Sequence, residues 1–181
     1  MILKVVGYGN TVLDQKAENI SAEYPKIEEL IENMFETMYN AHGVGLAAPQ
    51  VGLGIRLFVI DAAQMDEKLE GYKKVFINPK ITAHDDEEVK FEEGCLSIPG
   101  VRGKVKRPDE ITIHYLDENF EPQELTVDGI VSRIIQHEYD HIEGILFTEK
   151  LPYMKKQLIQ SKLKNIMKGK VPVEYPMKFA Q

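Results

Sequence analysis

The amino-acid sequence predicts an α+β fold, in which mostly antiparallel strands pack around a central helix and one further helix lies toward each end of the chain. Apolar residues recur at helical spacing in one early and two late segments, and short β-rich runs lie between them. This order is typical of α+β domains and not of parallel wound sheets. Since the chain has 181 residues and no long linker or internal repeat, we expect residues 1–181 to form one domain.

Three segments have the apolar spacing of helices. The first is expected to end before Gly43, and its apolar residues are Ile27, Leu30, Ile31, Met34 and Met38. The second runs from about Gly129 to Glu143, with Asp128 as the candidate N-cap and Gly144 as the stop. The third, over about 152–168, begins near Pro152 and carries Met154, Leu158, Leu163, Ile166 and Met167.

The region between the first two helices is rich in β-branched and aromatic residues. We expect strands over 56–61, 74–81, 110–116 and 124–127. In the third of these runs, Ile111, Ile113 and Tyr115 alternate with Thr112 and His114. This alternation is typical of a strand with one buried face.

A basic segment interrupts an otherwise acidic chain. The formal net charge is −7, which argues against DNA binding by the surface as a whole. Residues 150–170 nevertheless contain seven lysines and none of the 29 acidic residues. Most charge runs are solvated helix faces. The alternative is a docking element for an anionic partner such as the surface of a ribosome.

Composition indicates a cytoplasmic protein. No apolar run approaches the roughly 20 residues that a membrane span requires. Residues 1–10 lack the basic region, long apolar stretch and cleavage site of a signal peptide. The single cysteine, Cys95, excludes an intrachain disulfide and suits a reducing compartment.

The second predicted helix carries the strongest functional signal. Its apolar stripe continues, at the C-terminal end, into His137, Glu138 and His141. Three ionisable groups thus occupy positions that the periodicity marks as buried, where unpaired polar groups are costly. The outward face is expected to hold Ser132, Arg133, Gln136, Tyr139, Asp140 and Glu143.

A divalent metal ion would satisfy these three groups. Residues at i and i+4 project from one helix face, so the imidazoles of His137 and His141 can bind one ion. Glu138 would lie beside the ion, where it can take a proton from water and return it to a leaving group. Residues 137–141 thus match the H-E-x-x-H pattern of metallohydrolases.

Cys95 is the leading candidate for the third ligand. One zinc-peptidase pattern needs a histidine where Phe147 stands, and another needs a glutamate that the third predicted helix lacks. A thiolate and two imidazoles leave a fourth position open, as in catalytic sites. A lone cysteine is otherwise more often a small buried hydrophobe. We interpret the other histidines as ordinary surface or strand residues: His42, His84 and His114.

Two further segments are expected to approach a bound substrate. Residues 92–100, EEGCLSIPG, place Cys95 beside a glycine in a stretch that we expect to be irregular. Residues 43–50, GVGLAAPQ, taken alone indicate a helix C-cap and a tight turn, and no phosphate-loop lysine follows them. Their small side chains would let a peptide pass, and Gln50 could donate a hydrogen bond to a developing oxyanion.

In series, these three segments resemble the signatures of the peptide deformylase family. The signatures are G-x-G-x-A-A-x-Q, E-G-C-x-S and H-E-x-x-H with aspartate as its fourth residue, found here at 43–50, 93–97 and 137–141. The resemblance spans about the first 150 residues. It implies a metal-dependent hydrolase that removes the formyl group from the N-terminal formylmethionine of new polypeptides and releases formate.

The resemblance implies a role for each matched residue. The metal would be bound by Cys95, His137 and His141, with Glu138 as the general acid and base. The oxyanion would be stabilised by Gln50 and the N–H of Leu96, and Gly45 would contact the substrate backbone. Glu93 and Asp140 would orient the ligands. A methionine pocket is expected near Val44, Ile130, Ile134 and His137.

The resemblance also implies a metal ion and binding partners. Cysteine and histidine ligands suit several ions, and the resemblance implies Fe²⁺, with Zn²⁺, Ni²⁺ or Co²⁺ as substitutes. The lysine-bearing helix resembles that of the bacterial form, which docks on the ribosome, so the expected partners are nascent formylmethionyl polypeptides and the ribosome. Two alternatives are an H-E-x-x-H zinc endopeptidase and a metal-stapled binding module that uses the basic helix.

Overall fold

The computed structural model describes residues 1–181 and contains three α-helices: α1 (Ile27–Asn40), α2 (Gly129–Ile142) and α3 (Tyr153–Met167). The strands are β1 (Val5–Val6), β2 (Gly45–Ala47), β3 (Leu57–Asp61), β4 (Lys73–His84), β5 (Glu88–Cys95), β6 (Ile98–Pro108), β7 (Ile111–Leu116), β8 (Pro122–Val127) and β9 (Met177–Lys178). Short 3₁₀ helices occupy Thr11–Asp14, Ala48–Val51, Ala62–Gln64, Glu67–Tyr72 and Phe147–Lys150. None of the helices is long and apolar enough to cross a bilayer.

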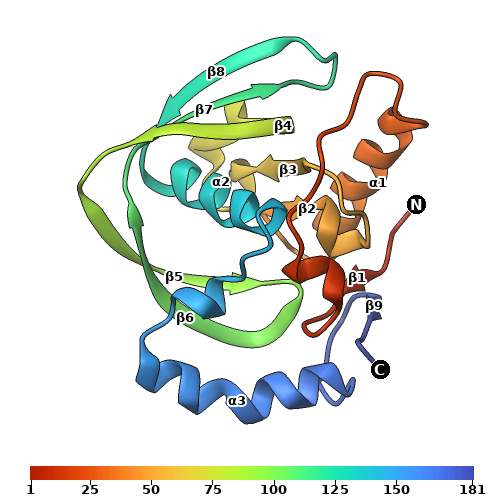
Figure 1. The fold of residues 1–181 in the computed structure, drawn as a ribbon, viewed down its shortest axis with the longest axis vertical. Helices are drawn as coiled ribbons and strands as arrows, with labels where there is room; N and C mark the ends of the chain where they lie inside the picture. The colour runs from red at the N-terminus through yellow and green to blue at the C-terminus, as the bar shows by residue number, and fades with distance from the viewer.

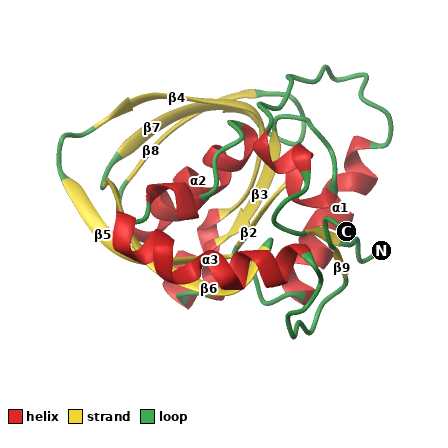
Figure 2. Ribbon diagram, turned by 60° about the horizontal axis from the view of Figure 1, so that its bottom comes forward, coloured by secondary structure: helices red, strands yellow, loops and turns green.

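Helix α2 lies between two β layers, as Figure 1 shows. One layer is a sheet in the order β2-β3-β4-β7-β8, in which all neighbouring strands are antiparallel. The other layer is the antiparallel hairpin of β5 and β6. The turned view in Figure 2 shows α3 on the outer side of β6. The predicted α+β fold, with antiparallel strands around the H-E-x-x-H helix, is therefore confirmed.

The predicted element boundaries lie within a few residues of those observed. Helix α2 begins at Gly129 with Asp128 in the N-cap position, although the Asp128 side chain makes no capping hydrogen bond. Gly144 follows the helix with a φ of +76°, and a Cβ atom there would lie 2.9 Å from the backbone oxygen of Asp14. Only glycine fits this left-handed position against a neighbouring backbone, so the chain leaves the helix where the sequence predicts.

The expectation that residues 92–100 are irregular was wrong. Glu92 to Cys95 complete β5, and Ile98 to Gly100 begin β6. The inward positions of β6 alternate along Val101, Gly103, Val105 and Arg107. The glycine accommodates Leu151 and the arginine is a buried charge. Two of these four inward positions therefore lack an apolar side chain, so the sequence does not show the alternation expected of a strand.

The predicted outward face of α2 was also largely wrong. Ser132, Arg133, Gln136 and Asp140 are all buried. The apolar stripe contacts the five-stranded sheet, whereas the hairpin of β5 and β6 covers much of the opposite face. A helix enclosed by two layers buries polar residues that periodicity alone assigns to solvent. These residues must then find partners inside the protein.

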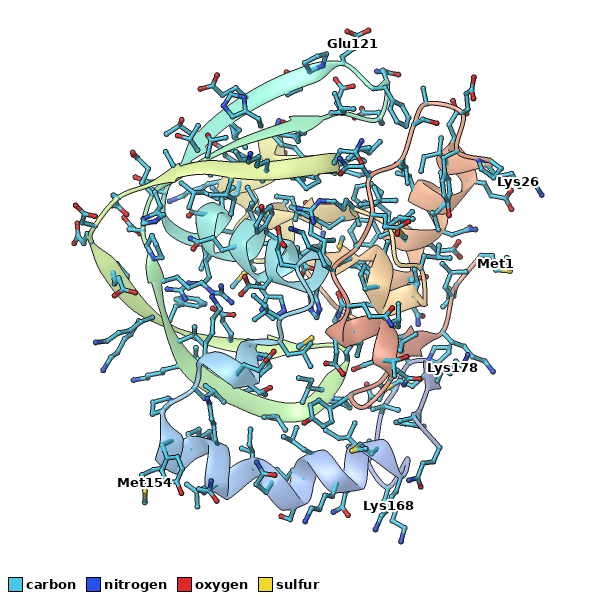
Figure 3. The ribbon with its side chains drawn as sticks, viewed as in Figure 1. Met1, Lys26, Glu121, Met154, Lys168 and Lys178 are labelled. Carbon is cyan, nitrogen blue, oxygen red and sulfur yellow. The ribbon has the colours of Figure 1, made fainter.

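Helix α3 buries only one narrow side. Ile159, Leu163 and Ile166 pack in a cluster with residues of β6. Met154 and Leu158, which also helped to predict this helix, are 73% and 72% exposed. Figure 3 shows Met154 and Lys168 near the two ends of α3, directed away from the body of the molecule. The helix therefore presents an outer face that combines lysines with large apolar side chains.

Candidate metal centre and catalytic site

The structure brings the three predicted ligands together. One ligand atom each from Cys95, His137 and His141 lie within 4.8 Å of one another. The Sγ of Cys95 is 3.3 Å from Nε2 of His141. The two histidines come from α2 and the cysteine from the end of β5. The site therefore forms where the hairpin layer contacts the central helix.

A carboxylate sets the tautomer of His137. Nδ1 of His137 lies 2.9 Å from Oε1 of Glu93. With Nδ1–H donating to this carboxylate, Nε2 keeps its lone pair and can bind a metal ion. Glu93 thus occupies the position, next to a ligand, that was expected of it.

Glu93 is itself held by two arginines. Arg107 donates to both of its carboxylate oxygens, at 2.7 and 3.0 Å, and Arg133 donates to Oε2 at 2.8 Å. Glu93 is 5% exposed and Arg107 is 2% exposed. Burial by itself would raise the pKa of Glu93, but hydrogen bonds from His137 and Arg107 and the positive charge of Arg107 outweigh it and hold that pKa well below its usual range. Glu93 therefore remains an acceptor at neutral pH.

Asp140 contacts a residue that holds Glu93, and it does not contact the metal ligands themselves. Its Oδ2 accepts from Nη1 of Arg107 at 2.7 Å and lies 3.3 Å from Nζ of Lys150. Asp140 therefore orients the guanidinium that holds Glu93, which in turn holds His137. Such chains of charged hydrogen bonds are strong because the local dielectric constant is low.

Glu138 is buried beside the ligands. It is 4% exposed, and its Oε2 has no hydrogen-bond partner. A Cβ at Gly45 would lie 2.6 Å from Oε1 of Glu138, so any other residue at 45 would displace this carboxylate. Burial raises the pKa of Glu138 to about 7, with the negative charge of Glu93 adding to the shift and the positive charge of Arg107 opposing it.

These residues fit a divalent metal ion. A thiolate with two imidazoles is a donor set that binds such ions with one position open. The unpartnered oxygen of Glu138 is the kind of buried acceptor that a water molecule at the open position would satisfy. Nδ1 of His141 is also buried without a partner. A cation at this point would lower the pKa of the neighbouring carboxyl.

Two hydrogen-bond donors lie next to Cys95. Oε1 of Gln50 accepts from the N–H of Ala47 at 3.0 Å, which turns Nε2 toward Sγ of Cys95 at 3.4 Å and Oγ of Ser97 at 3.2 Å. The N–H of Leu96 donates to no acceptor in the protein. The N–H of Leu96 is therefore free for a bound substrate, and the amide of Gln50 lies at the same edge of the site, with Cys95 and Ser97 as its present acceptors.

A cavity of about 830 Å³ opens at these groups. Val44, Ile130, Ile134 and His137 line it, where a methionine pocket was expected. His42 also borders it, whereas His84 and His114 are exposed strand residues away from it. The size and partly apolar lining suit a small peptide end.

Several residues of this site were not predicted from the sequence. Arg107 shares the inward parity of Val101 and Val105 on β6, which could have marked it as buried. Arg133 lies one turn before His137 on α2, so the two share a helix face. No sequence pattern predicted that residues 172–175 would line the cavity.

Comparisons with known proteins agree on one family. The polypeptide deformylase family matches residues 2–157. A peptide deformylase of Christiangramia forsetii is 57% identical over 99% of this chain and 96% of that protein, and one of Flavobacterium johnsoniae is 54% identical over 99% and 97%. A solved peptide deformylase of Plasmodium falciparum has a TM-score of 0.85 and 36% identity, over 92% of this chain and 96% of the other. One from Legionella pneumophila has a TM-score of 0.84 and 37% identity, over 95% and 100%.

Replacing Glu93 tests whether it supports the metal ligands. We expect Glu93→Gln to weaken metal binding by roughly 10- to 100-fold, because a neutral amide holds His137 and the two arginines less firmly. The adjacent Glu92→Gln is a matched control, since Glu92 pairs only with Arg102 on the surface. Competition with a chromogenic chelator measures both affinities. Equal affinity in the two variants would contradict the role assigned to Glu93.

Proposed function

Because this chain belongs to the peptide deformylase family and so removes the N-formyl group from nascent polypeptides, we propose that the reaction takes place in the cavity beside Cys95. The observation that carries this proposal is the unpartnered Glu138 carboxylate next to the Cys–His–His group. In this assignment Cys95, His137 and His141 bind the metal. The catalytic residues are Glu138, Gln50, Leu96 and Gly45.

The native metal in this proposal is Fe²⁺, with Zn²⁺, Ni²⁺ or Co²⁺ as substitutes. All four ions accept a mixed thiolate and imidazole donor set. When bound, the ion supplies a Lewis acid that polarises the formyl carbonyl and acidifies water. Because ferrous iron bound by a thiolate is open to oxidation, we expect the activity to be oxygen-sensitive.

The protein residues move the protons in this mechanism. Glu138 takes a proton from a water molecule that attacks the formyl carbon. Nε2 of Gln50 and the N–H of Leu96 donate hydrogen bonds to the oxyanion that develops on the former carbonyl oxygen. Glu138 then transfers its proton to the amine nitrogen as the carbon–nitrogen bond breaks, and formate leaves. The buried position of Glu138 beside the Cys–His–His group, with one oxygen unpartnered, suits a group that must both accept and donate a proton.

The cavity also suits the rest of the substrate. Val44, Ile130 and Ile134 give an apolar lining for a methionine side chain. Gly45, which has no room for a side chain, lets the substrate backbone approach Glu138 closely. The absence of a side chain at residue 45 thus leaves room for both the Glu138 carboxylate and the substrate peptide.

Replacing Glu138 tests the proposed mechanism. We expect Glu138→Gln to bind one metal ion and to lower kcat by roughly 10²- to 10⁴-fold, because the amide cannot transfer a proton. Glu143→Gln, five residues further along, is the control, since Glu143 pairs with Arg56 and Lys16 outside the cavity. Formate release from a short formyl-Met peptide measures both. A folded, metal-loaded Glu138→Gln with parental turnover would overturn the assignment of Glu138 as the group that transfers the proton.

The ribosome is the second partner in this proposal. Helix α3 and the residues on either side of it carry seven lysines, and no acidic residue lies between 150 and 170. Met154 and Leu158 add exposed apolar surface to the same helix. A basic face with apolar side chains suits a ribosomal surface. Residues 1–181 would then act as one catalytic domain in the cytoplasm, where nascent chains emerge.

Reversing charges on α3 tests the docking proposal. We expect the triple change Lys162→Glu, Lys164→Glu and Lys168→Glu to weaken salt-dependent cosedimentation with ribosomes by at least about tenfold. Turnover of a short formyl-Met peptide should stay unchanged, because α3 lies outside the cavity. The control makes the same charge change elsewhere on the surface, at Lys26, Lys68 and Lys80. Equal loss of binding in both variants would contradict a specific role for α3.

A further inference from the structure

The chain beyond α3 returns to the catalytic site. Strand β9 pairs in parallel with β1 near the N-terminus, as Figure 1 shows. The N–H of Val5 donates to the carbonyl of Pro176 at 2.9 Å, and that of Gly7 donates to the carbonyl of Lys178 at 2.9 Å. These bonds fix the segment before β9, residues 172–176, against the body of the protein. The family match ends at residue 157, so this segment lies beyond it.

One side chain of this segment contacts the backbone of the site directly. The hydroxyl of Tyr175 donates to the carbonyl of Leu96 at 2.7 Å. Tyr175 is half-buried, and together with Pro172, Val173 and Glu174 it lines the cavity. A hydrogen bond of this length to a backbone carbonyl restrains the rotation of that peptide unit.

The residues around Leu96 are restrained from other directions as well. The N–H of Tyr8 donates to the carbonyl of Ser97 at 2.9 Å, and Nε2 of Gln50 donates to Oγ of Ser97 at 3.2 Å. Leu96 itself lies in the turn between β5 and β6 and does not take part in the strand ladder. The tyrosine hydroxyl is the only side-chain group that binds its backbone.

We propose that Tyr175 is a positioning residue that holds the turn at Leu96 so that its free N–H points at the developing oxyanion. The inference rests on the proposed role of the Leu96 N–H. A donor aimed in advance stabilises the transition state without reorganising during the reaction. The effect of Tyr175 should therefore appear in kcat, whereas a residue that only contacts substrate would change KM.

Tyr175→Phe removes the hydroxyl and keeps the ring. We expect kcat for a short formyl-Met peptide to fall about fivefold, in line with the loss of one neutral hydrogen bond, and KM to stay within about twofold. Metal content and thermal midpoint should match those of the parent protein. Tyr115→Phe is the control, because Tyr115 packs on Phe76 in the five-stranded sheet, away from the cavity. An unchanged kcat, or a rise in KM alone, would overturn the inference.

An amide-to-ester replacement at Leu96 separates this inference from the proposed role of Leu96. The ester removes the Leu96 N–H and leaves its side chain and its own carbonyl in place. If the ester lowers kcat but Tyr175→Phe does not, the role of Leu96 stands and that of Tyr175 fails. If the ester leaves kcat unchanged, the proposed role of Leu96 fails, and the positioning role of Tyr175 with it. A lower kcat in both supports the inference.

Discussion

The carboxylate of Glu93 is the group on which the rest of the site depends. It lies in β5 and binds His137 of α2, and it is bound in turn by Arg107 of β6 and Arg133 of α2. Taking a carboxylate and two guanidinium groups out of water is costly, and loss of one partner of such a buried set typically destabilises a protein by about 3–5 kcal/mol. The network therefore joins the hairpin layer to the central helix only in the arrangement that satisfies every charge.

The same constraint orders the metal ligands. Cys95 follows Glu93 by two residues, so fixing the end of β5 fixes the cysteine as well as the ring of His137. Asp140 extends the network by holding Arg107, although it contacts no ligand. The metal ligands and the Glu138 carboxylate thus lie on β5 and α2, two elements that this network joins, and the proposed oxyanion donors Gln50 and Leu96 lie beside Cys95. Such preorganisation is what acyl-transfer sites require.

Much of this arrangement could be predicted from the sequence. The apolar stripe of α2 continues directly into His137, Glu138 and His141. Because the chain lacks the third ligand of two common zinc-peptidase patterns, Cys95 was the leading candidate for that position. The hairpin of β5 and β6 could not be predicted by alternation, because Gly103 and Arg107 occupy inward positions. The buried face of α2 that the hairpin covers was assigned to solvent because its residues are polar. Periodicity detects apolar burial, whereas it misses charges that are buried because they are paired with one another.

The most direct test of a single metal site is a titration of metal-free protein, under anaerobic conditions, with Fe²⁺, Zn²⁺, Ni²⁺ or Co²⁺ while formate release from a formyl-Met peptide is followed. We expect no turnover without metal and a linear rise that ends at one equivalent per chain. We also expect that Fe²⁺ supports turnover and that air then abolishes it. Turnover without metal, or a rise that continues to two equivalents, would contradict a single ion held by Cys95, His137 and His141.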